Sequence, residues 1–237
     1  MAQAGMHGMV GMLTRKWTGT REWLLLGAIL GSFIPDMDNV GVAIATLTTM
    51  PTEGIHRTLT HSLFFEAAVV LVFFLIGQAT KNARWTNLGL GLGLGILLHI
   101  LLDLVLWFNG VEILWPLPSW VNLWENTAPP AWLLTLLEPA EFLFFGLYLW
   151  MLGSWARKAN TDTGFLKTLR IWILLEFSLF VVFTPLAYIM TSGFLTIYGA
   201  LYLFSLFMIF FVTIRMRETV EVTVSDSQLN MRMPATR

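Results

Sequence analysis

Long apolar runs separated by short polar segments define the pattern of this chain. The runs cover residues 23–34, 40–50, 63–76, 88–108, 132–155, 169–190 and 194–214. A helix needs about 20 residues to cross the hydrocarbon core of a bilayer, so 23–34 is too short to cross alone, whereas 63–76 and the later runs are better span candidates. The pattern predicts an all-α fold: a polytopic integral membrane helical bundle with about six membrane-spanning or re-entrant helical segments.

Composition supports the membrane class and narrows the chemistry. Of the 237 residues, 56% are hydrophobic and only 12% are charged, which is about half the charged fraction of a soluble domain. The formal net charge of −1 supplies no basic stripe for phosphates, which argues against a nucleic-acid partner. The chain has no cysteine, so any metal ligands must be nitrogen and oxygen atoms.

Basic residues alternate between the predicted loops and set the expected orientation. Loops 77–87 and 156–168 and the carboxyl-terminal segment carry lysine or arginine, whereas loops 109–131 and 191–193 carry none. The positive-inside rule places the basic loops and the carboxyl terminus in the cytoplasm. Loops 35–62 and 109–131 then face outward in a multi-pass protein of the cell membrane.

Ionisable side chains gather at this outward face. They are Asp36, Asp38, His56, Arg57, His61, His99 and Asp103. Pro35 ends the preceding apolar helix and leaves the two neighbouring aspartates in an extended or turn geometry. His99 and Asp103 are i and i+4 near the outward end of a predicted helix, so they share one face. Because charges are costly in a membrane, so many groups at one face need a common partner.

A divalent cation would be such a partner. Imidazole and carboxylate ligands suit zinc, manganese or magnesium, and this number of ligands allows one to three ions. With an open coordination position the site would activate water for hydrolysis, and Arg57 would hold an anionic group of the substrate. Taken singly, the residues also have structural explanations: a helix-end turn for the aspartates, a packing contact for His99 and an interfacial anchor for Arg57.

Other polar and small residues have two interpretations each. Glu138 and Glu141 flank Pro139 at the outward start of a span. They could supply a further metal ligand or a base, or they could cap the helix at the membrane interface. Glu176 lies inside the run 169–190. It is either a functional carboxylate within the membrane or a protonated carboxyl that hydrogen-bonds to a neighbouring helix.

Two further patterns concern helix packing and capping. Glycines recur at every second position from 89 to 95. This gives GxxxG spacing on two helix faces and predicts close helix packing beside the site. Thr60 or Ser62 is expected to cap a helix that begins near Leu63.

The motifs resemble those of the membrane-bound metal-dependent hydrolase family, the YbcI/YdjM-like proteins (domain of unknown function 457). The shared elements are Gly31-Ser32, Pro35-Asp36-x-Asp38, His56-Arg57-x-x-Thr60-His61-Ser62-Leu63, His99-x-x-x-Asp103 and Trp115-Pro116. Their order and spacing match over residues 7–116. The chain departs from the pattern at Thr58-Leu59, where the family has a glycine and an aromatic residue.

The resemblance implies a metal-dependent hydrolase and a set of site residues. The implied ligands are His7, Asp36, Asp38, His56, His61, His99 and Asp103, and the expected catalytic residues are Asp38, as ligand or base, with Arg57 and His61. A remoter likeness, in the order His, Asp, His, His-x-x-x-Asp, is to zinc-dependent phospholipase C enzymes. It suggests phosphoester or phospholipid substrates.

The implied role of His7 conflicts with the charge pattern. Arg15, Lys16 and Arg21 suggest a cytoplasmic amino end, yet His7 must reach the outward site. A re-entrant hairpin, with 6–14 entering and 22–34 returning, reconciles the two only if its basic turn lies unusually deep.

Together these observations predict three regions and one function. Residues 1–131 form the hydrolase-like domain that bears the metal site, 132–214 form additional transmembrane helices packed on it, and 215–237 form a flexible polar cytoplasmic tail. The expected function is metal-dependent hydrolysis of an ester or phosphoester in a lipid or amphiphile. A cation transporter or channel, with ionisable residues along several spans, and a non-catalytic protein with a closed structural metal site are the alternatives.

Overall fold

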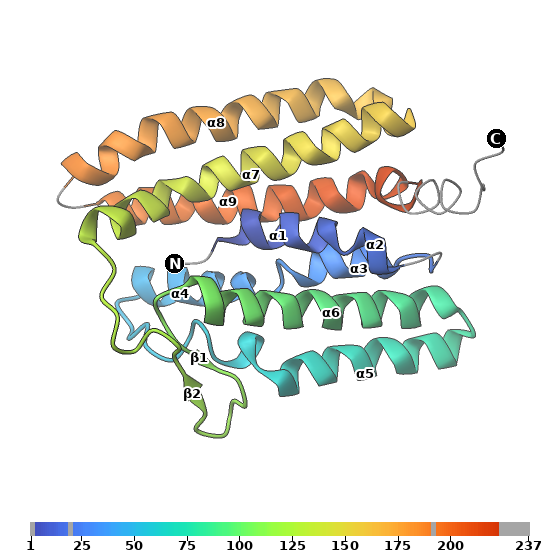
Figure 1. The fold of residues 1–237 in the computed structure, drawn as a ribbon, viewed down its shortest axis with the longest axis horizontal. Helices are drawn as coiled ribbons and strands as arrows, with labels where there is room; N and C mark the ends of the chain where they lie inside the picture. Colours follow the sequence, from blue (N-terminus) through green and yellow to red (C-terminus); the bar gives the residue numbers. More distant parts are fainter. Residues whose placement is uncertain (1–2, 19–20, 191–192, 223–237) are drawn as a thin grey trace, which may run out of the picture.

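The computed structural model describes residues 3–18, 21–190 and 193–222, which are almost entirely helical (Figure 1). The elements are α1 (Ala4–Leu13), α2 (Arg15–Thr18), α3 (Leu24–Gly31), η1 (Pro35–Asp38), α4 (Asn39–Leu47), η2 (Leu59–His61), α5 (Leu63–Thr80), α6 (Ala83–Leu106), β1 (Val111–Glu112), β2 (Trp120–Val121), α7 (Ala131–Ala159), η3 (Thr163–Phe165), α8 (Leu166–Ile189) and α9 (Phe194–Arg215). Five helices, α5 to α9, are long and apolar enough to cross a membrane, or up to six if α3 and Pro35–Leu47 form one span bent by 41°. The predicted helical membrane bundle is confirmed.

The helices form two groups joined by the amino-terminal helix. Figure 1 shows α7, α8 and α9 on one side of α1, and α3, α6 and α5 on the other. Helix α1 packs against both α7 and α3, and the ring of Phe33 stands edge-on against that of Tyr148 at 5.3 Å. The amino-terminal segment is therefore a central element of the core.

Glycines allow the close packing of α6 against its two neighbours. A Cβ on Gly91 or Gly95 would overlap the backbone of α3, at Leu24 and Ala28 respectively. A Cβ on Gly89 or Gly93 would instead meet side chains of α5. The predicted packing on two faces is confirmed.

Basic residues collect at one end of the bundle. The guanidinium of Arg15 lies 5.0 Å from the ring centroid of Trp155, near the end of α7. Glu22 pairs with Arg84 at the start of α6, which lowers the pKa of the Glu22 carboxyl. The turn of the α1–α3 hairpin therefore lies at the same end of the bundle as the α5–α6 and α7–α8 turns. Among the described residues, every lysine and arginine except Arg57 is at this end.

This arrangement removes the conflict over His7. Helix α1 begins at the opposite end of the bundle and runs toward the basic turn, and α3 returns beside α6. His7 can therefore lie near the non-basic end while Arg15, Lys16 and Arg21 stay with the other cations, at the level of the other basic turns.

The segment after α9 differs from the prediction. Residues 217–222 are helical, and Met216, Thr219 and Val220 are buried. The amide and hydroxyl of Thr219 donate to Asp162 at 3.1 and 2.8 Å. The prediction of a flexible tail is wrong for 216–222, because apolar residues of this segment join the core; residues 223–237 lie outside the described residues.

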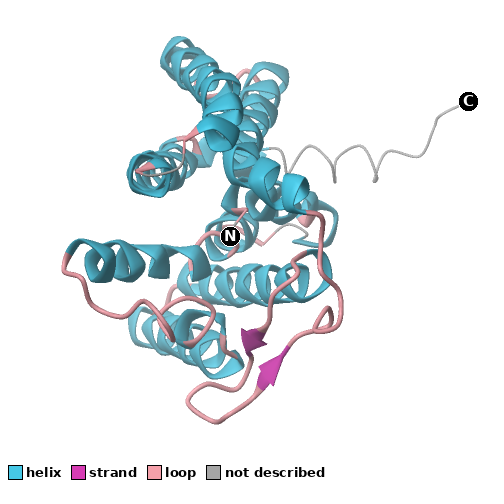
Figure 2. Cartoon of the chain, turned by 90° about the vertical axis from the view of Figure 1, so that its left-hand side faces the viewer, coloured by secondary structure: helices cyan, strands magenta, loops and turns pink. Residues whose placement is uncertain are grey.

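The non-basic end carries the loops that build the candidate site. Figure 2 looks onto this end, where the strands β1 and β2 pair antiparallel within the loop 109–131. The hydroxyl of Ser62 accepts from the amide of Phe65 at 3.1 Å and caps α5, as predicted. The backbone amide of Glu112 donates to the carbonyl of Arg57 at 3.0 Å, which ties the strand to the loop that carries the site.

Candidate metal centre

Side chains from four separate elements meet inside the non-basic end of the bundle. His7 comes from α1, Asp36 from η1, His61 from η2, and His99 and Asp103 from α6. All five are fully buried. With a rise of about 1.5 Å per residue, His99 lies about 10 Å inside the end of α6. Polar groups at this depth need specific partners.

Four donor atoms converge in this cluster. The Nε2 atoms of His61 and His99 are 3.3 Å apart, and Oδ2 of Asp103 lies 3.6 and 3.8 Å from them. The Oδ1 atom of Asp36 is 3.7 Å from His99 Nε2. Ligand atoms on tetrahedral zinc, with bonds of about 2.0–2.1 Å, are about 3.3–3.4 Å apart. The Nε2 atoms of His61 and His99 and the Oδ2 atom of Asp103 thus have nearly the spacing of three ligands on one tetrahedral metal ion, and the carboxylate of Asp36 lies beside His99.

The hydrogen bonds of the imidazoles favour this ligand set. Nδ1 of His99 lies 2.9 Å from the carbonyl oxygen of Ser32. Because a carbonyl can only accept, Nδ1 carries the proton and Nε2 presents its lone pair to the cluster. Only one ion can use that lone pair, although His99 belongs to two groups that could each hold a metal.

Asp38 orients the neighbouring imidazoles rather than joining this set. Its Oδ1 lies 2.7 Å from Nδ1 of His56, and its Oδ2 lies 3.3 Å from Nδ1 of His61 and accepts from the hydroxyl of Thr60 at 2.9 Å. A carboxylate on the far nitrogen of a ligating histidine fixes the ring and raises its basicity. Burial lowers the pKa of His56, so its imidazole is neutral near pH 7.

His7 reaches the cluster through contacts with the second half of the chain. Its Nε2 lies 3.1 Å from Oδ1 of Asp103, and its ring stacks on His99 with centroids 3.7 Å apart. The amide of Gly5 donates to Glu141 of α7 at 2.9 Å, and the side chain of Gln3 donates to a carbonyl of α7 at 2.6 Å. Helix α7 therefore fixes the start of α1, two residues before His7.

Arg57 is a buried cation with unused donors. Its side chain is 2% exposed, and Nη2 lies 3.6 Å from Oδ2 of Asp103. Among the described residues, none of its three guanidinium nitrogens has a hydrogen-bond partner. Its backbone has φ of +64°, in the left-handed region, and its amide donates to Asp38 at 3.3 Å. Uncommon backbone conformations of this kind often occur at functional sites.

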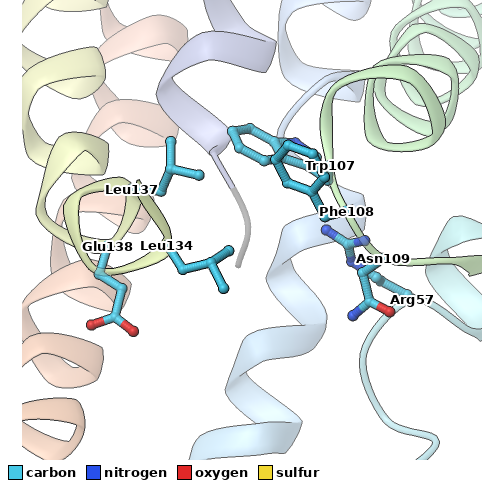
Figure 3. Close-up of a pocket in the computed structure, with 7 residues that line it drawn as sticks. All are labelled: Arg57, Trp107, Phe108, Asn109, Leu134, Leu137 and Glu138. Carbon is cyan, nitrogen blue, oxygen red and sulfur yellow. The ribbon is translucent and has the colours of Figure 1, made fainter. Parts of the chain in front are cut away.

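A cavity of about 290 Å³ adjoins the cluster at Arg57 (Figure 3). Its lining residues are Arg57, Trp107, Phe108, Asn109, Leu134, Leu137 and Glu138. Figure 3 shows the first four on one wall, facing Leu134, Leu137 and Glu138 of α7. The cluster therefore has a neighbouring space in which a further molecule can contact Arg57.

The formal charges of the cluster call for a divalent cation. With neutral imidazoles, its three aspartates contribute −3 and Arg57 contributes +1, which leaves −2 in a buried volume. Uncompensated buried charge is strongly unfavourable. Three groups of side chains here could hold a metal ion: His7, His99 and Asp103; Asp36, His61 and His99; and Asp38, His56 and His61.

The structure brings together every predicted site residue. The seven predicted ligands and Arg57 form one connected cluster. Glu138 lines the cavity, whereas Trp115-Pro116 lies in the loop between β1 and β2. Glu176 is buried in α8, outside the three metal-holding groups. Glu141 is neither a ligand in these groups nor the cap of its own helix; it accepts a hydrogen bond from the amide of Gly5 instead.

Comparison with known protein families places the chain beside a family of membrane proteins. The model of a family described as YdjM inner membrane protein matches residues 3–191. No curated protein and no solved structure matches the chain. The matched segment contains all the site residues and extends through α7 and α8.

Proposed function

This chain belongs to the YdjM inner membrane protein family, and we propose that it is a membrane-embedded metal-dependent hydrolase. One observation carries the proposal: a buried set of two imidazoles and two carboxylates lies beside a cavity lined by Arg57, whose guanidinium is 3.6 Å from Asp103 and has no hydrogen-bond partner among the described residues. Catalysis needs a coordination position left open for water, and a cavity next to the cluster favours such a centre over a closed structural site.

The ligands of the proposed centre follow from the geometry. His61, His99 and Asp103 would hold a divalent cation whose remaining position is open to water, with Asp36 as a further carboxylate beside His99. Zinc is the best match to this donor set, with manganese or magnesium as alternatives. When bound, the cation would lower the pKa of a coordinated water and polarise the oxygen of the scissile ester or phosphoester. The substrate would be a lipid or another amphiphile, since the centre lies within the membrane-spanning bundle.

The remaining polar residues would serve binding and proton transfer. Asp38 would keep His61 in the ligating tautomer, and it would also hold the ring of His56 through Nδ1. The Nε2 atom of His56 has no hydrogen-bond partner among the described residues, so it would accept a proton from the attacking water. Arg57 would hold the anionic group and stabilise charge that develops during the reaction.

The charge distribution supports an outward-facing site. The basic end would lie in the cytoplasm together with Arg215, by the positive-inside rule. Because the chain has no cysteine, single cysteines can report the orientation. We expect Glu53→Cys to react with a membrane-impermeant maleimide in intact spheroplasts, and Lys81→Cys to react only after permeabilisation. Labelling of Lys81→Cys alone in intact spheroplasts would reverse the assignment.

Hydrolysis by the purified full-length protein tests the proposed function. We expect wild-type protein in detergent to hydrolyse phosphodiester or carboxylic ester amphiphiles, to lose activity with a chelator and to regain it with zinc or manganese. His61→Ala is expected to lower kcat/KM by at least about a thousandfold, because it removes a ligand of the proposed centre. Glu125→Ala, an exposed carboxylate on the same side of the bundle, serves as the matched control. Metal-loaded wild-type protein that hydrolyses neither class would overturn the proposal.

A further inference from the structure

Two walls face each other across the cavity beside the cluster (Figure 3). One carries the guanidinium of Arg57 and the amide of Asn109, together with Trp107 and Phe108; we call it the polar wall after the first two groups. The facing wall on α7 carries Leu134 and Leu137, together with the carboxyl of Glu138; we call it the apolar wall after its two leucines. The polar wall belongs to the half with the metal ligands, and the apolar wall is the first turns of α7, in the half without them. A ligand that fills the cavity therefore touches both halves.

The polar wall selects for an anion. Arg57 is 2% exposed, and its three guanidinium nitrogens have no hydrogen-bond partner among the described residues. Two oxygens of a phosphate can accept two parallel hydrogen bonds from a guanidinium. Arg57 already lies 3.6 Å from the carboxylate of Asp103, and an uncharged carboxylic ester would offer its unused N–H groups only a neutral acceptor. The geometry at Arg57 therefore fits a phosphoester better than a carboxylic ester.

The apolar wall suits the hydrocarbon part of the same molecule. Leu134 and Leu137 are i and i+3 on α7, so they lie on one face of the helix. The side chain of Leu134 is 46% exposed and can contact a ligand without first being unpacked. The cavity lies where α6 ends and α7 begins, at one end of two candidate spans. An amphiphile in the adjacent leaflet has its polar group near this level and its chain toward the spans.

We propose that the cavity binds an anionic phosphoester amphiphile across the two halves of the chain. Its phosphate contacts Arg57 beside the metal ligands, and the first part of its apolar chain contacts Leu134 and Leu137. The two leucines are thus specificity-determining residues for long-chain substrates. This inference rests on the proposed function for its catalytic part, but it also makes a prediction about binding alone.

Two phosphodiesters that share one reacting group test the apolar wall. Dodecyl p-nitrophenyl phosphate and methyl p-nitrophenyl phosphate differ only in chain length. We expect wild-type protein to have a kcat/KM at least about tenfold higher for the dodecyl compound. The double variant Leu134→Ser/Leu137→Ser is expected to lose that preference, because its kcat/KM falls far more for the dodecyl compound than for the methyl compound. Leu123→Ser, an exposed leucine outside the cavity, should keep the preference.

A binding measurement separates this inference from the proposed function. We expect dodecyl phosphate to bind wild-type protein in calorimetric titrations, and binding to weaken by at least about tenfold in Arg57→Gln and in the double leucine variant. If wild-type protein hydrolyses no ester but these binding differences appear, the proposed function fails and the cavity assignment stands. If it hydrolyses phosphodiesters but the leucine variant changes neither chain preference nor dodecyl phosphate binding, the inference is wrong.

Discussion

Replacing Asp103 with alanine is expected to abolish tight metal binding. The loss of affinity should exceed the 10- to 100-fold that removal of a ligand's hydrogen-bonding partner typically costs. Asp103 supplies Oδ2 to the converging ligand atoms and Oδ1 to His7, and it forms an ion pair with the guanidinium of Arg57. Among the described residues, no other side chain contacts the converging ligand atoms, His7 and Arg57 together. Calorimetric titration of purified protein with zinc and manganese measures the change.

The same variant has a thermal signature. A metal that binds only the folded state raises Tm by mass action, so we expect zinc to raise the Tm of wild-type protein. The rise should vanish in Asp103→Ala and persist in Glu125→Ala, which removes an exposed carboxylate on the same side of the bundle. An undiminished Tm rise in Asp103→Ala would contradict the ligand assignment.

The second large effect is expected at Gly95, which offers no side chain to a metal but lies at the close contact between α3 and α6. A Cβ on Gly95 would overlap the carbonyl of Ala28 and fall within 2.6 Å of the amide of Ser32. Gly95→Ala should therefore push α3 away from α6; α6 carries His99, and α3 leads directly into η1, which carries Asp36. Overpacking of a helix contact costs about 1–3 kcal/mol or more. We expect a lower Tm and at least about tenfold weaker metal binding.

A glycine in open space provides the control for this variant. A Cβ added at Gly199 on α9 meets no atom within 4 Å. Gly199→Ala is therefore expected to change neither Tm nor metal affinity by a measurable amount. If Gly95→Ala behaves like Gly199→Ala, the close contact between α3 and α6 does not position the site.

Much of this site could be predicted because its residues obey local rules. The i, i+4 spacing of His99 and Asp103 requires a shared helix face. The prediction for Pro35 is wrong in position: α3 ends at Gly31, four residues earlier, and Pro35 begins the 3₁₀ helix η1 that contains Asp36. The hydroxyl of Ser62 caps α5, as its position before an apolar run predicts. These features depend on neighbours within a few residues, so the sequence alone is enough to infer them.

Long-range contacts explain what could not be predicted. The roles of Glu141 and Ser32 depend on partners more than 60 residues away in the chain, and no local pattern encodes such pairings. The hairpin of α1 and α3 consists of helices too short to be recognised as spans. Its position along the bundle is therefore defined only by long-range contacts such as that of Glu22 with Arg84. Likewise, burial of Met216 and Val220 depends on packing against the bundle rather than on their polar neighbours.

One buried set of nitrogen and oxygen ligands should hold a divalent cation, and elemental analysis of purified full-length protein and of His99→Ala measures its occupancy. We expect about one equivalent of divalent metal per wild-type chain and less than about a tenth of that in the variant, because His99 offers the central Nε2 ligand. Wild-type protein without stoichiometric metal, after incubation with zinc and manganese, would contradict this expectation.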